Sequence, residues 1–407
     1  MEPRRIIFLS LVQIDSLQDR GIYHDLLREF ASQGHKVTVV CPVERRTGLV
    51  TSIFKESGAT ILQVRTLNVQ KSSLWEKGLA TITLNFLLQS AIKKHLKGVS
   101  FDLVLYATPP ITITKLIQWL KYVHRAKSYL LLKDIFPQNA VDMRMFRANS
   151  LIHKYFIRQE QELYALSDRI GCMSPANVNY IIKHHPEMNG KIEVNPNSLD
   201  LTKVKREEEV QRVEVLAKWK IPTDAVIFLY GGNLGKPQGT DFLLKLINNR
   251  ARYPKAYFLI VGDGTDYNKL KEWFDANTPI NGRLIQRLPK RDFDELAACC
   301  DVGLIMLRKE FTIPNFPSRL LTYLENRMPV LAITDEVSDL GRIAEAEGFG
   351  KWCIYGEEEN ASKYIGYFES EDQARIEMGR KGFVFMQTAY DVKQSYNKII
   401  DFVQESN

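Results

Sequence analysis

Apolar and amphipathic segments alternate regularly along the first half of the chain. A largely apolar run at residues 6–12 is followed by a polar loop, by apolar positions at helical spacing over residues 22–32, and by Gly34, which suits a helix end. Similar apolar runs recur at residues 36–41, 101–107, 128–132 and 169–173. Such runs, separated by helices, are typical of a parallel sheet covered on both faces. The pattern predicts one Rossmann-like domain over residues 1–200.

The same rhythm starts again after a turn at residues 195–200. A charged helical stretch, residues 203–220, leads to Pro222 and to a new apolar strand at residues 226–230. Further strands are expected at residues 256–261, 284–286 and 302–306, with helices starting near Asp241 and at Asp292, a good N-cap. These elements predict a second Rossmann-like domain over residues 201–385. The remaining segment, 386–407, carries a final helix at about residues 392–405, and packing back on the first domain is one of the directions that the sequence leaves open.

Two α/β domains in series suit the length of the chain. At 407 residues it exceeds the roughly 250–300 residues at which single cores divide. Loops that follow parallel strands gather at the carboxyl edge of a sheet, and ligands bind there. We therefore expect an α/β protein whose two Rossmann-like domains face one another across a cleft that holds the active site.

Composition and charge narrow the classes of protein. The chain has 45% hydrophobic and 25% charged residues and no low-complexity tract, which predicts a folded protein throughout. Its five cysteines include no C-x-x-C pair or zinc spacing, and the N-terminus lacks a signal core, so we expect a cytoplasmic protein without a structural metal. Residues 1–200 carry 26 Lys and Arg against 17 Asp and Glu. That excess suits an anionic partner or an ordinary surface, but it lacks the clustered basic run typical of nucleic-acid binding.

The segment from Tyr230 to Asp241, Tyr-Gly-Gly-Asn-Leu-Gly-Lys-Pro-Gln-Gly-Thr-Asp, joins a strand to a helix through a glycine-rich turn. Small residues there let backbone N–H groups approach an anion such as a nucleotide diphosphate, although they also permit tight packing of strand against helix. The segment has neither a Walker sequence nor G-x-G-x-x-G. Val261-Gly-Asp-Gly264 and Arg287-Leu-Pro-Lys290 follow the next two strands, which places Gly262 and Leu288 on the same edge as ligand contacts or structural turns.

A polar loop with prolines, residues 311–317, precedes a helix expected to start near Pro317 and Ser318. Proline in a first turn and serine at the cap leave backbone N–H groups pointing out of that helix end. With Arg319 in the first turn, these donors are candidates for stabilising a leaving pyrophosphate, unless Arg319 is a solvated structural residue.

The stretch Pro317-Ser-Arg-Leu-Leu-Thr-Tyr-Leu-Glu-Asn-Arg-Met-Pro-Val330 resembles the P-S-K-x-x-x-Y-x-x-x-G-x-P-V stretch of family 4 retaining glycosyltransferases, especially those that build bacterial O-antigen and capsular polysaccharides. Other blocks agree in order over about residues 6–340. They are Gly232-Asn-Leu-Gly-x-x-Gln-Gly239, Phe101-Asp-Leu-Val with Thr108-Pro-Pro110, Lys133-Asp-Ile-Phe-Pro137 and Pro196-Asn-x-x-Asp200.

This resemblance implies a GT-B fold, a nucleotide diphosphate sugar held mainly by the second domain, an acceptor held by the first, retention at the anomeric carbon, and no obligatory metal or other cofactor. The implied donor is a nucleotide sugar, with UDP favoured. The implied donor-side residues are Gly21, Gly232, Asn233, Gly235, Gln238, Gly262, Leu288, Pro314, Asn315, Phe316, Pro317, Ser318, Leu320 and Thr322, with Lys236 and Arg319 as the candidate cations.

The chain departs from the family pattern at several of these positions. Two glutamates eight positions apart, common in the family, correspond to Pro314 and Thr322, so the usual carboxylate contact to the ribose is missing. Asn233 and Gln238 stand where an arginine and a lysine are common, and Arg327 replaces a glycine. These departures leave the identity of the donor open.

Acid residues at strand ends are the first-domain candidates. Asp134 follows a predicted strand at the edge that faces the cleft, and there it either orients the sugar, accepts the acceptor's proton or has a structural role. Asp142 follows it, and Asp15, Arg20 and Gly21 lie in the loop after the first strand, like the family's first-domain glycine loop. We interpret His24 as a surface residue.

Asp292-Phe-Asp294 fits the D-x-D pattern of metal-dependent glycosyltransferases, but its place at a helix start favours capping.

Residues 75–97 combine an uncharged stretch with Lys71, Lys77, Lys93, Lys94 and Lys97 at its ends. Fifteen uncharged residues, 78–92, are too few for the roughly 20 that span a bilayer. A basic apolar helix suits contact with an anionic membrane and a lipid-linked acceptor, and a core helix with a charged end is the alternative.

We therefore expect a cytoplasmic enzyme, with peripheral contact to the inner face of the cell membrane left open. It is expected to transfer a hexose-type unit from a nucleotide sugar to a hydroxyl of a glycan or polyprenyl-linked acceptor in surface polysaccharide synthesis. The alternatives are a nucleotide-sugar epimerase of the same fold and a non-catalytic nucleotide-sugar-binding scaffold. Nucleic acid is not an expected partner.

Overall fold

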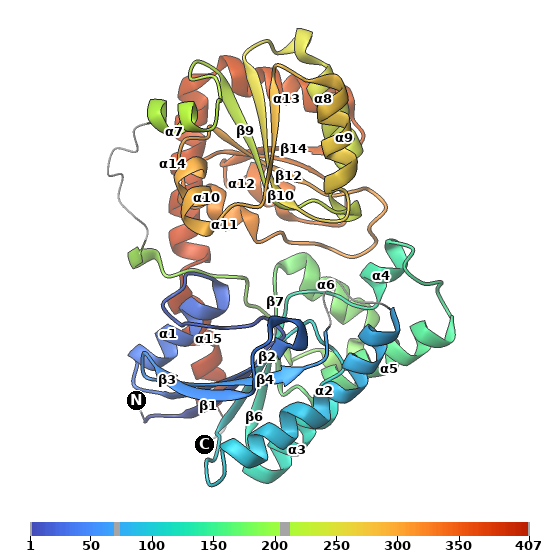
Figure 1. The fold of residues 1–407 in the computed structure, drawn as a ribbon, viewed down its shortest axis with the longest axis vertical. Helices are drawn as coiled ribbons and strands as arrows, with labels where there is room; N and C mark the ends of the chain where they lie inside the picture. The colour runs from blue at the N-terminus through green and yellow to red at the C-terminus, as the bar shows by residue number, and fades with distance from the viewer. Residues whose placement is uncertain (1, 69–73, 204–211, 406–407) are drawn as a thin grey trace. The chain divides into compact units, whose positions relative to one another are not determined.

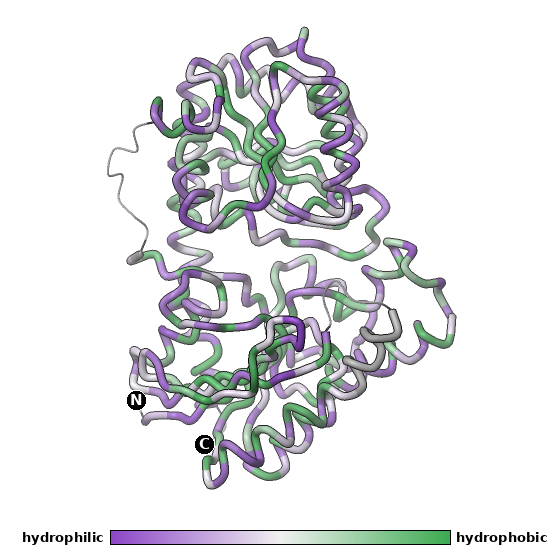
Figure 2. Tube along the Cα trace, in the orientation of Figure 1, coloured by the Kyte–Doolittle hydropathy of each residue, from purple (hydrophilic) through white to green (hydrophobic). Residues whose placement is uncertain are grey.

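A computed structural model of the protein describes residues 2–68, 74–203 and 212–405. Its contacts divide the chain into two compact units. Unit 1 comprises residues 1–200 with 391–407, and unit 2 comprises residues 201–390. Both units have the α/β build that the strand–helix rhythm predicts, and in each the apolar stretches run along the strands (Figure 2).

Unit 1 is built on an eight-stranded sheet with the order β3-β4-β2-β1-β5-β6-β7-β8. All neighbouring strands pair in parallel except β3 with β4 (Figure 1). The strands are β1 (Arg5–Leu9), β2 (Lys36–Glu44), β3 (Ser52–Glu56), β4 (Ala59–Thr66), β5 (Leu103–Ala107), β6 (Lys127–Leu132), β7 (Arg169–Cys172) and β8 (Ile192–Val194). The helices are α1 (Ile22–Ser32), α2 (Leu74–His95), α3 (Thr114–His124), α4 (Gln138–Asp142), α5 (Leu151–Leu166), α6 (Pro175–His184) and α15 (Val392–Gln404).

Unit 2 has a parallel six-stranded sheet with the order β11-β10-β9-β12-β13-β14. The strands are β9 (Val226–Asn233), β10 (Ala256–Asp263), β11 (Gly282–Gln286), β12 (Val302–Met306), β13 (Val330–Thr334) and β14 (Gly350–Ile354). The helices are α7 (Arg212–Lys218), α8 (Thr240–Asn248), α9 (Tyr267–Asn277), α10 (Lys290–Ala297), α11 (Arg319–Glu325), α12 (Leu340–Ala346), α13 (Glu358–Ser370) and α14 (Asp372–Ala389).

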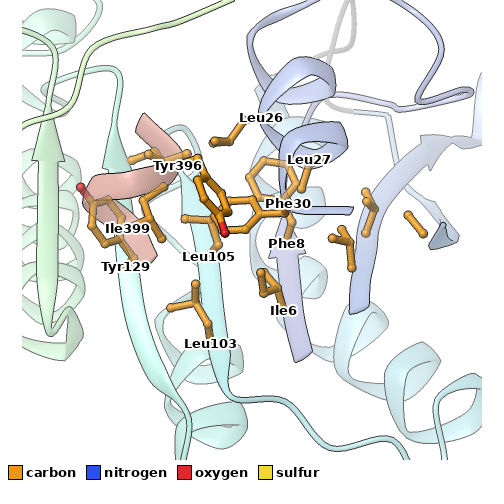
Figure 3. Close-up of a cluster of buried hydrophobic side chains, with 14 of the residues drawn as sticks. Ile6, Phe8, Leu26, Leu27, Phe30, Leu103, Leu105, Tyr129, Tyr396 and Ile399 are labelled. Atoms are coloured by element: carbon orange, nitrogen blue, oxygen red, sulfur yellow. The ribbon is translucent and has the colours of Figure 1, made fainter. Parts of the chain in front are cut away.

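The C-terminal helix belongs to unit 1, although it follows unit 2 in the chain. Buried α15 side chains, including Tyr396 and Ile399, join a core cluster with Phe8, Phe30 and Leu105 (Figure 3). The returning segment begins at Asp391 rather than at residue 386, because residues 386–389 still belong to α14.

The segment singled out for membrane contact forms α2, a helix of 22 residues. Lys71 and the side chains of residues 74–82 lie outside what the structure describes. In the remainder, Leu84, Leu88 and Ile92 are buried, whereas Phe86 is exposed. Among the described residues, no helix is long and apolar enough to cross a bilayer.

The five cysteines are unpaired and buried. Burial raises the pKa of Cys41 to about 11 and that of Cys353 to about 12, so these thiols are protonated at neutral pH.

Candidate functional site

The first residues of the glycine-rich segment, Gly231 to Asn233, belong to β9. The parallel ladder between β9 and β10 continues through Gly231, Gly232 and Asn233, whereas the predicted strand ended at Tyr230. Gly232 has a φ of 118°, which favours glycine. A Cβ atom on Gly262 would lie 1.9 Å from the carbonyl oxygen of Gly232. Glycine at position 262 therefore lets the two strand ends approach closely and fixes the path of the loop.

Strands β9 and β12 separate at the level of this loop, at the point where the strand order of unit 2 reverses. Their ladder is short and joins Val302 to Phe228 and Gly303 to Leu229. Beyond it, Tyr323 of α11 bridges the two strands, because its hydroxyl accepts a hydrogen bond from the Gly231 N–H (3.1 Å) and donates one to the Leu304 carbonyl (3.1 Å). Reversal points at the carboxyl ends of parallel strands are where open α/β sheets bind ligands.

Arg319 lies at this reversal point. Its guanidinium carbon is 4.2 Å from the centre of the Tyr230 ring, and Nη2 is 3.5 Å from the Asn233 carbonyl oxygen, which also accepts the Tyr230 hydroxyl (3.0 Å). The Nη1 atom is buried and has no hydrogen-bond partner among the described residues. A buried guanidinium nitrogen without an acceptor is costly, so the arrangement suits an incoming anion.

Gln238, at the end of the glycine-rich loop, holds the loop's backbone and side chains together. Its side-chain oxygen accepts hydrogen bonds from the Gly235 N–H (3.1 Å) and the Asn233 amide (3.3 Å). Lys236 is exposed and has no ion-pair partner among the described residues. The structure thus brings Gly232, Asn233 and Arg319 together, whereas Gln238 organises the loop and Lys236 lies on its outer surface.

The loops after the neighbouring strands lie on the same edge. The Leu234 N–H donates to the Asp263 carbonyl (2.9 Å), and the Asp266 N–H donates to the Leu234 carbonyl (2.9 Å), so the turn that follows Gly262 is tied to the glycine-rich loop. Leu288 is half-buried and follows β11, the edge strand on that side of the sheet.

The helix expected near Ser318 begins at Arg319 and has only seven residues. The Ser318 side chain does not cap it, and two first-turn N–H groups are already used, Leu320 to the Pro317 carbonyl (3.2 Å) and Leu321 to the Ser318 carbonyl (3.1 Å). The prediction of several free N–H donors at this helix start was therefore wrong for these two groups. The guanidinium of Arg319 is the principal donor there.

The loop before α11 is anchored from the other side. The Asn315 N–H donates to the Ser338 hydroxyl (2.9 Å), and that hydroxyl donates to the buried carboxylate of Asp335 (3.0 Å). Pro314 is buried, Phe316 is half-buried with its ring centre 6.3 Å from that of Tyr390, and Thr322 is half-buried on α11. Neither Pro314 nor Thr322 offers a carboxylate, as the sequence indicates.

Unit 1 presents its own candidate residues at the carboxyl edge of its sheet. The Thr108 hydroxyl, at the end of β5, accepts the backbone N–H groups of Lys133 (3.0 Å) and Asp134 (3.3 Å) and so fixes the loop after β6. The Asp134 side chain reaches the surface, but loss of hydration raises its pKa to about 6, against a smaller lowering by a hydrogen bond with Asn139. Burial lowers the pKa of Lys133 to about 7.

The loop that ends at Gly21 is held by the buried carboxylate of Asp25. Asp25 accepts the N–H groups of Gly21 (3.2 Å) and Asp200 (2.8 Å) and pairs with Arg28, which also donates to the Asp19 carbonyl (2.6 Å). Sequence reasoning missed this structural role of Asp25, whose signal is an acidic residue in the first turn of a helix.

The other first-domain candidates have separate surroundings. Asp15 is exposed and accepts the Gln63 amide (2.8 Å), and Asp142 accepts the Gln138 amide (2.7 Å) at the end of α4. Arg20 is half-buried, and so is His24, which was interpreted as a surface residue. Burial lowers the pKa of His24.

Both carboxylates of the D-x-D pattern form ion pairs with lysines. Asp292 pairs with Lys218 (3.1 Å), and Asp294 pairs with Lys290 (3.0 Å). The predicted N-cap role of Asp292 was wrong, because α10 begins at Lys290 after Pro289. In the part of the chain that the structure describes, no group of three or more His, Cys, Asp or Glu residues is placed to hold a metal ion.

Three residues at the unit 2 edge were not singled out from the sequence. Tyr230 and Tyr323 hold Arg319 and the glycine-rich loop. Tyr323 fills the tyrosine position of the P-S-K-x-x-x-Y stretch and Tyr230 opens the glycine-rich segment, but neither was predicted as a site residue. Arg308 follows β12, donates its N–H to the Pro237 carbonyl (3.0 Å) and pairs with Asp241 (3.3 Å), which links that strand end to the loop.

Models of two protein families match the two halves of the chain. The one described as Glycosyltransferase Family 4 matches residues 22–203, and the one described as Glycosyl transferases group 1 matches residues 211–384. The chain belongs to glycosyltransferase family 4. The predicted family and the GT-B fold are thereby confirmed.

Relatives of this glycosyltransferase agree with that assignment. The probable glycosyltransferase WbjE of Pseudomonas aeruginosa is 27% identical over 292 residues, which cover 70% of this chain and 69% of that protein. Sucrose-phosphate synthase from Thermosynechococcus elongatus superposes with a TM-score of 0.74 at 13% identity, covering 99% of each chain. Anabaena Alr3699/HepE in complex with UDP superposes with a TM-score of 0.69 at 13% identity, covering 98% of this chain and 99% of that one. At these identities the solved structures show a shared fold.

Proposed function

We propose that this glycosyltransferase transfers a sugar from a nucleotide diphosphate sugar, with UDP favoured, to a hydroxyl of a glycan or lipid-linked glycan in surface polysaccharide synthesis. The observation that carries the donor part is the guanidinium of Arg319, whose buried Nη1 atom has no hydrogen-bond partner among the described residues, beside the Gly231–Asn233 backbone. Support for UDP comes from Anabaena Alr3699/HepE, which shares the fold and has been solved with UDP and with UDP-glucose.

In this proposal Arg319 binds the diphosphate of the donor and stabilises its charge as the sugar–oxygen bond breaks. Gly232 leaves the space beside the guanidinium open for the diphosphate, because a Cβ atom at this position would lie in van der Waals contact with the guanidinium carbon, 3.7 Å away. Leu288 is assigned to the nucleobase side, and Pro314, Asn315, Phe316 and Thr322 to the sugar and ribose side.

The proposed transfer is retaining and independent of metal. The leaving phosphate takes the proton of the acceptor hydroxyl. Arg319 supplies the positive charge that a metal ion provides in other enzymes. Asp134 orients the sugar on the acceptor side. With a pKa raised to about 6, its carboxyl group is mainly ionised at neutral pH.

A ligand screen by thermal shift tests the donor. UDP-, GDP- and TDP-sugars are compared, since a ligand that binds only the folded state raises the melting temperature. We expect UDP-sugars to give the largest shift, and Arg319→Met to abolish it. Arg327→Met is the matched control, because Arg327 follows the opposite end of α11 and also packs against an aromatic ring, that of Phe383 at 5.0 Å.

The outcomes separate the alternatives. No shift with any nucleotide sugar, or an unchanged shift in Arg319→Met, contradicts the donor site. Interconversion of UDP-sugars without an acceptor assigns the chain to the epimerases. The absence of carboxylates at positions 314 and 322 is the feature of the chain that favours a non-catalytic scaffold. That alternative is supported if the donor binds but no sugar is transferred to any acceptor in a panel of glycans.

A further inference from the structure

An exposed apolar surface surrounds the start of α5 in unit 1. Leu151 is 87% exposed, Ile152 57%, Tyr155 46%, and Met145 of the preceding loop 68%. Leu151, Ile152 and Tyr155 lie within the first two turns of one helix. Single exposed apolar residues are ordinary, but four within eleven positions of the chain form a patch that calls for a partner. We call these four residues the α5 surface.

The α5 surface is held in place rather than frayed. The Ser150 hydroxyl caps α5 by accepting the His153 N–H (3.3 Å). Beneath the surface, the ring of Phe156 lies 4.9 Å from that of Phe136 and 6.0 Å from that of Phe146. These aromatic rings pack against one another in the same segment, whereas Leu151 and Ile152 are exposed.

The charged side chains within the segment that carries the α5 surface have one sign. Residues 143–159 contain four arginines or lysines and no aspartate or glutamate. Arg158 pairs with Glu162 (2.8 Å), whereas Arg144, Arg147 and Lys154 are exposed and have no carboxylate partner among the described residues. Exposed apolar side chains with unpaired cations close by in the same segment are suited to the interface of a membrane with anionic headgroups.

The α5 surface lies at the same edge of the unit 1 sheet as the acceptor-side candidate Asp134. Helix α5 follows β6 and precedes β7, so it starts at the carboxyl edge of the sheet, where Asp134 also lies (Figure 1). A second exposed pair, Tyr122 (86%) and Val123 (51%), lies at the end of α3, which leads into the amino end of β6. There the nearby Lys121 is neutralised by Asp168 (2.8 Å).

We propose that the α5 surface docks this protein on an anionic phospholipid membrane, with Leu151 and Ile152 entering the headgroup region and Arg144, Arg147 and Lys154 contacting lipid phosphates. Docking there brings the acceptor-side edge of unit 1 to the membrane. Its use in presenting a lipid-linked acceptor rests on the proposed function, whereas vesicle binding itself does not.

Vesicle flotation with the full chain tests the proposal. Vesicles of phosphatidylglycerol and phosphatidylcholine are compared with vesicles of phosphatidylcholine alone, without nucleotide or acceptor. We expect wild type to bind the anionic vesicles and not the neutral ones. The variants Leu151→Asp/Ile152→Asp and Arg147→Glu/Lys154→Glu are each expected to lower the partition coefficient by about tenfold or more. Tyr122→Asp/Val123→Asp, a matched exposed pair at the other edge of the sheet, is expected to bind as wild type does.

Three results overturn the proposal: wild type that does not bind anionic vesicles, equal binding to both kinds of vesicle, and wild-type binding by either α5 variant. A dimer seen by light scattering that Leu151→Asp/Ile152→Asp converts to monomer assigns the patch to a second copy of the chain instead. The charge-reversal variant changes exposed side chains only, so it guards against misfolding of the aspartate variant. A failed thermal shift with UDP-sugars leaves the vesicle result intact, which separates this inference from the proposed transfer.

Discussion

Arg319 stacks on Tyr230, with its guanidinium carbon 4.2 Å from the ring centre, and both residues contact the carbonyl oxygen of Asn233. The two residues come from different elements, α11 and β9, that meet where the sheet of unit 2 reverses its order. The stack holds a cation beside the glycine-rich backbone at the end of β9. This arrangement gives the proposed donor site its shape.

Two substitutions of Tyr230 test whether its ring positions Arg319. A cation over an aromatic ring contributes roughly 0.5–2 kcal/mol. Tyr230→Phe keeps the ring and loses only the hydroxyl bond to Asn233, whereas Tyr230→Leu loses both. We expect titration calorimetry with UDP to show binding weakened by about two- to thirtyfold more in Tyr230→Leu than in Tyr230→Phe. Equal affinities in the two variants would show that the ring does not position Arg319.

Gly262→Ala tests the close approach of the strand ends. The added methyl group would stand 1.9 Å from the Gly232 carbonyl oxygen, and two paired strands have little room to separate. We expect a loss of about 1–3 kcal/mol in the free energy of unfolding, together with weaker UDP binding, because the glycine-rich loop moves.

Gly366→Ala is the control for that substitution. Gly366 lies within α13 and has nothing within 4 Å of the added position, so alanine there is expected to stabilise by up to about 1 kcal/mol. Urea unfolding of both variants decides the matter. A Gly262→Ala protein as stable as wild type would show that the strands separate easily.

The sequence predicted the elements of this fold well where the local pattern determines them. Helix α1 spans Ile22–Ser32 as predicted, because its apolar positions follow one face and Gly34, with a φ of 85°, ends the segment. The β9 end was predicted too early, since Gly231 signals a turn in sequence but pairs with Val261 in the sheet.

The donor site was predictable only in part. Gly232 and Arg319 were found because they lie in recognisable motifs. The stacking of Arg319 on Tyr230 and the bridge made by Tyr323 depend on how α11 packs against β9 and β12, which no local pattern encodes. Asp292 was misassigned as an N-cap because Pro289 and Lys290 start the helix earlier, and a single acidic residue does not distinguish a cap from a first-turn position.

Helix α15 is expected to stabilise unit 1 rather than unit 2. The Ile399 side chain is fully buried in the unit 1 core, and Tyr396 contacts His35 through a 2.9 Å hydrogen bond. Ile399→Ala is expected to lower the free energy of unfolding of unit 1 by about 2–4 kcal/mol. Lys393→Ala, on the exposed side of the same helix, is expected to change it by less than about 0.5 kcal/mol.

Hydrogen exchange read by mass spectrometry locates the effect of Ile399→Ala. Faster exchange is expected in β1, β2 and β5, which contribute to the same core cluster, and not in the strands of unit 2. Faster exchange confined to unit 2 would contradict the assignment of α15.

Glu160 makes the stability of unit 1 depend on pH. Its side chain is buried on α5, accepts a hydrogen bond from the Tyr164 hydroxyl (3.1 Å) and lies 3.8 Å from the ring of His185, whose own pKa is lowered by burial. Burial raises the pKa of Glu160 from 4.5 to about 8, and the Tyr164 hydrogen bond opposes that shift. The folded protein therefore binds this proton more tightly than the unfolded chain does. The contribution of protonated Glu160 to the free energy of unfolding is fully present below about pH 4.5 and is lost as the pH rises through about 8.

Glu160→Gln removes this titration and keeps an oxygen to accept the Tyr164 hydroxyl. We expect the variant to match wild type near pH 4.5 and to exceed it increasingly toward pH 9, by on the order of a few kcal/mol, in urea unfolding followed across that range. Glu162→Gln removes a carboxylate from the exposed ion pair with Arg158 and is expected to change stability by less than about 1 kcal/mol at either pH. A difference between Glu160→Gln and wild type that stays constant with pH would show that Glu160 is ionised in the folded protein throughout.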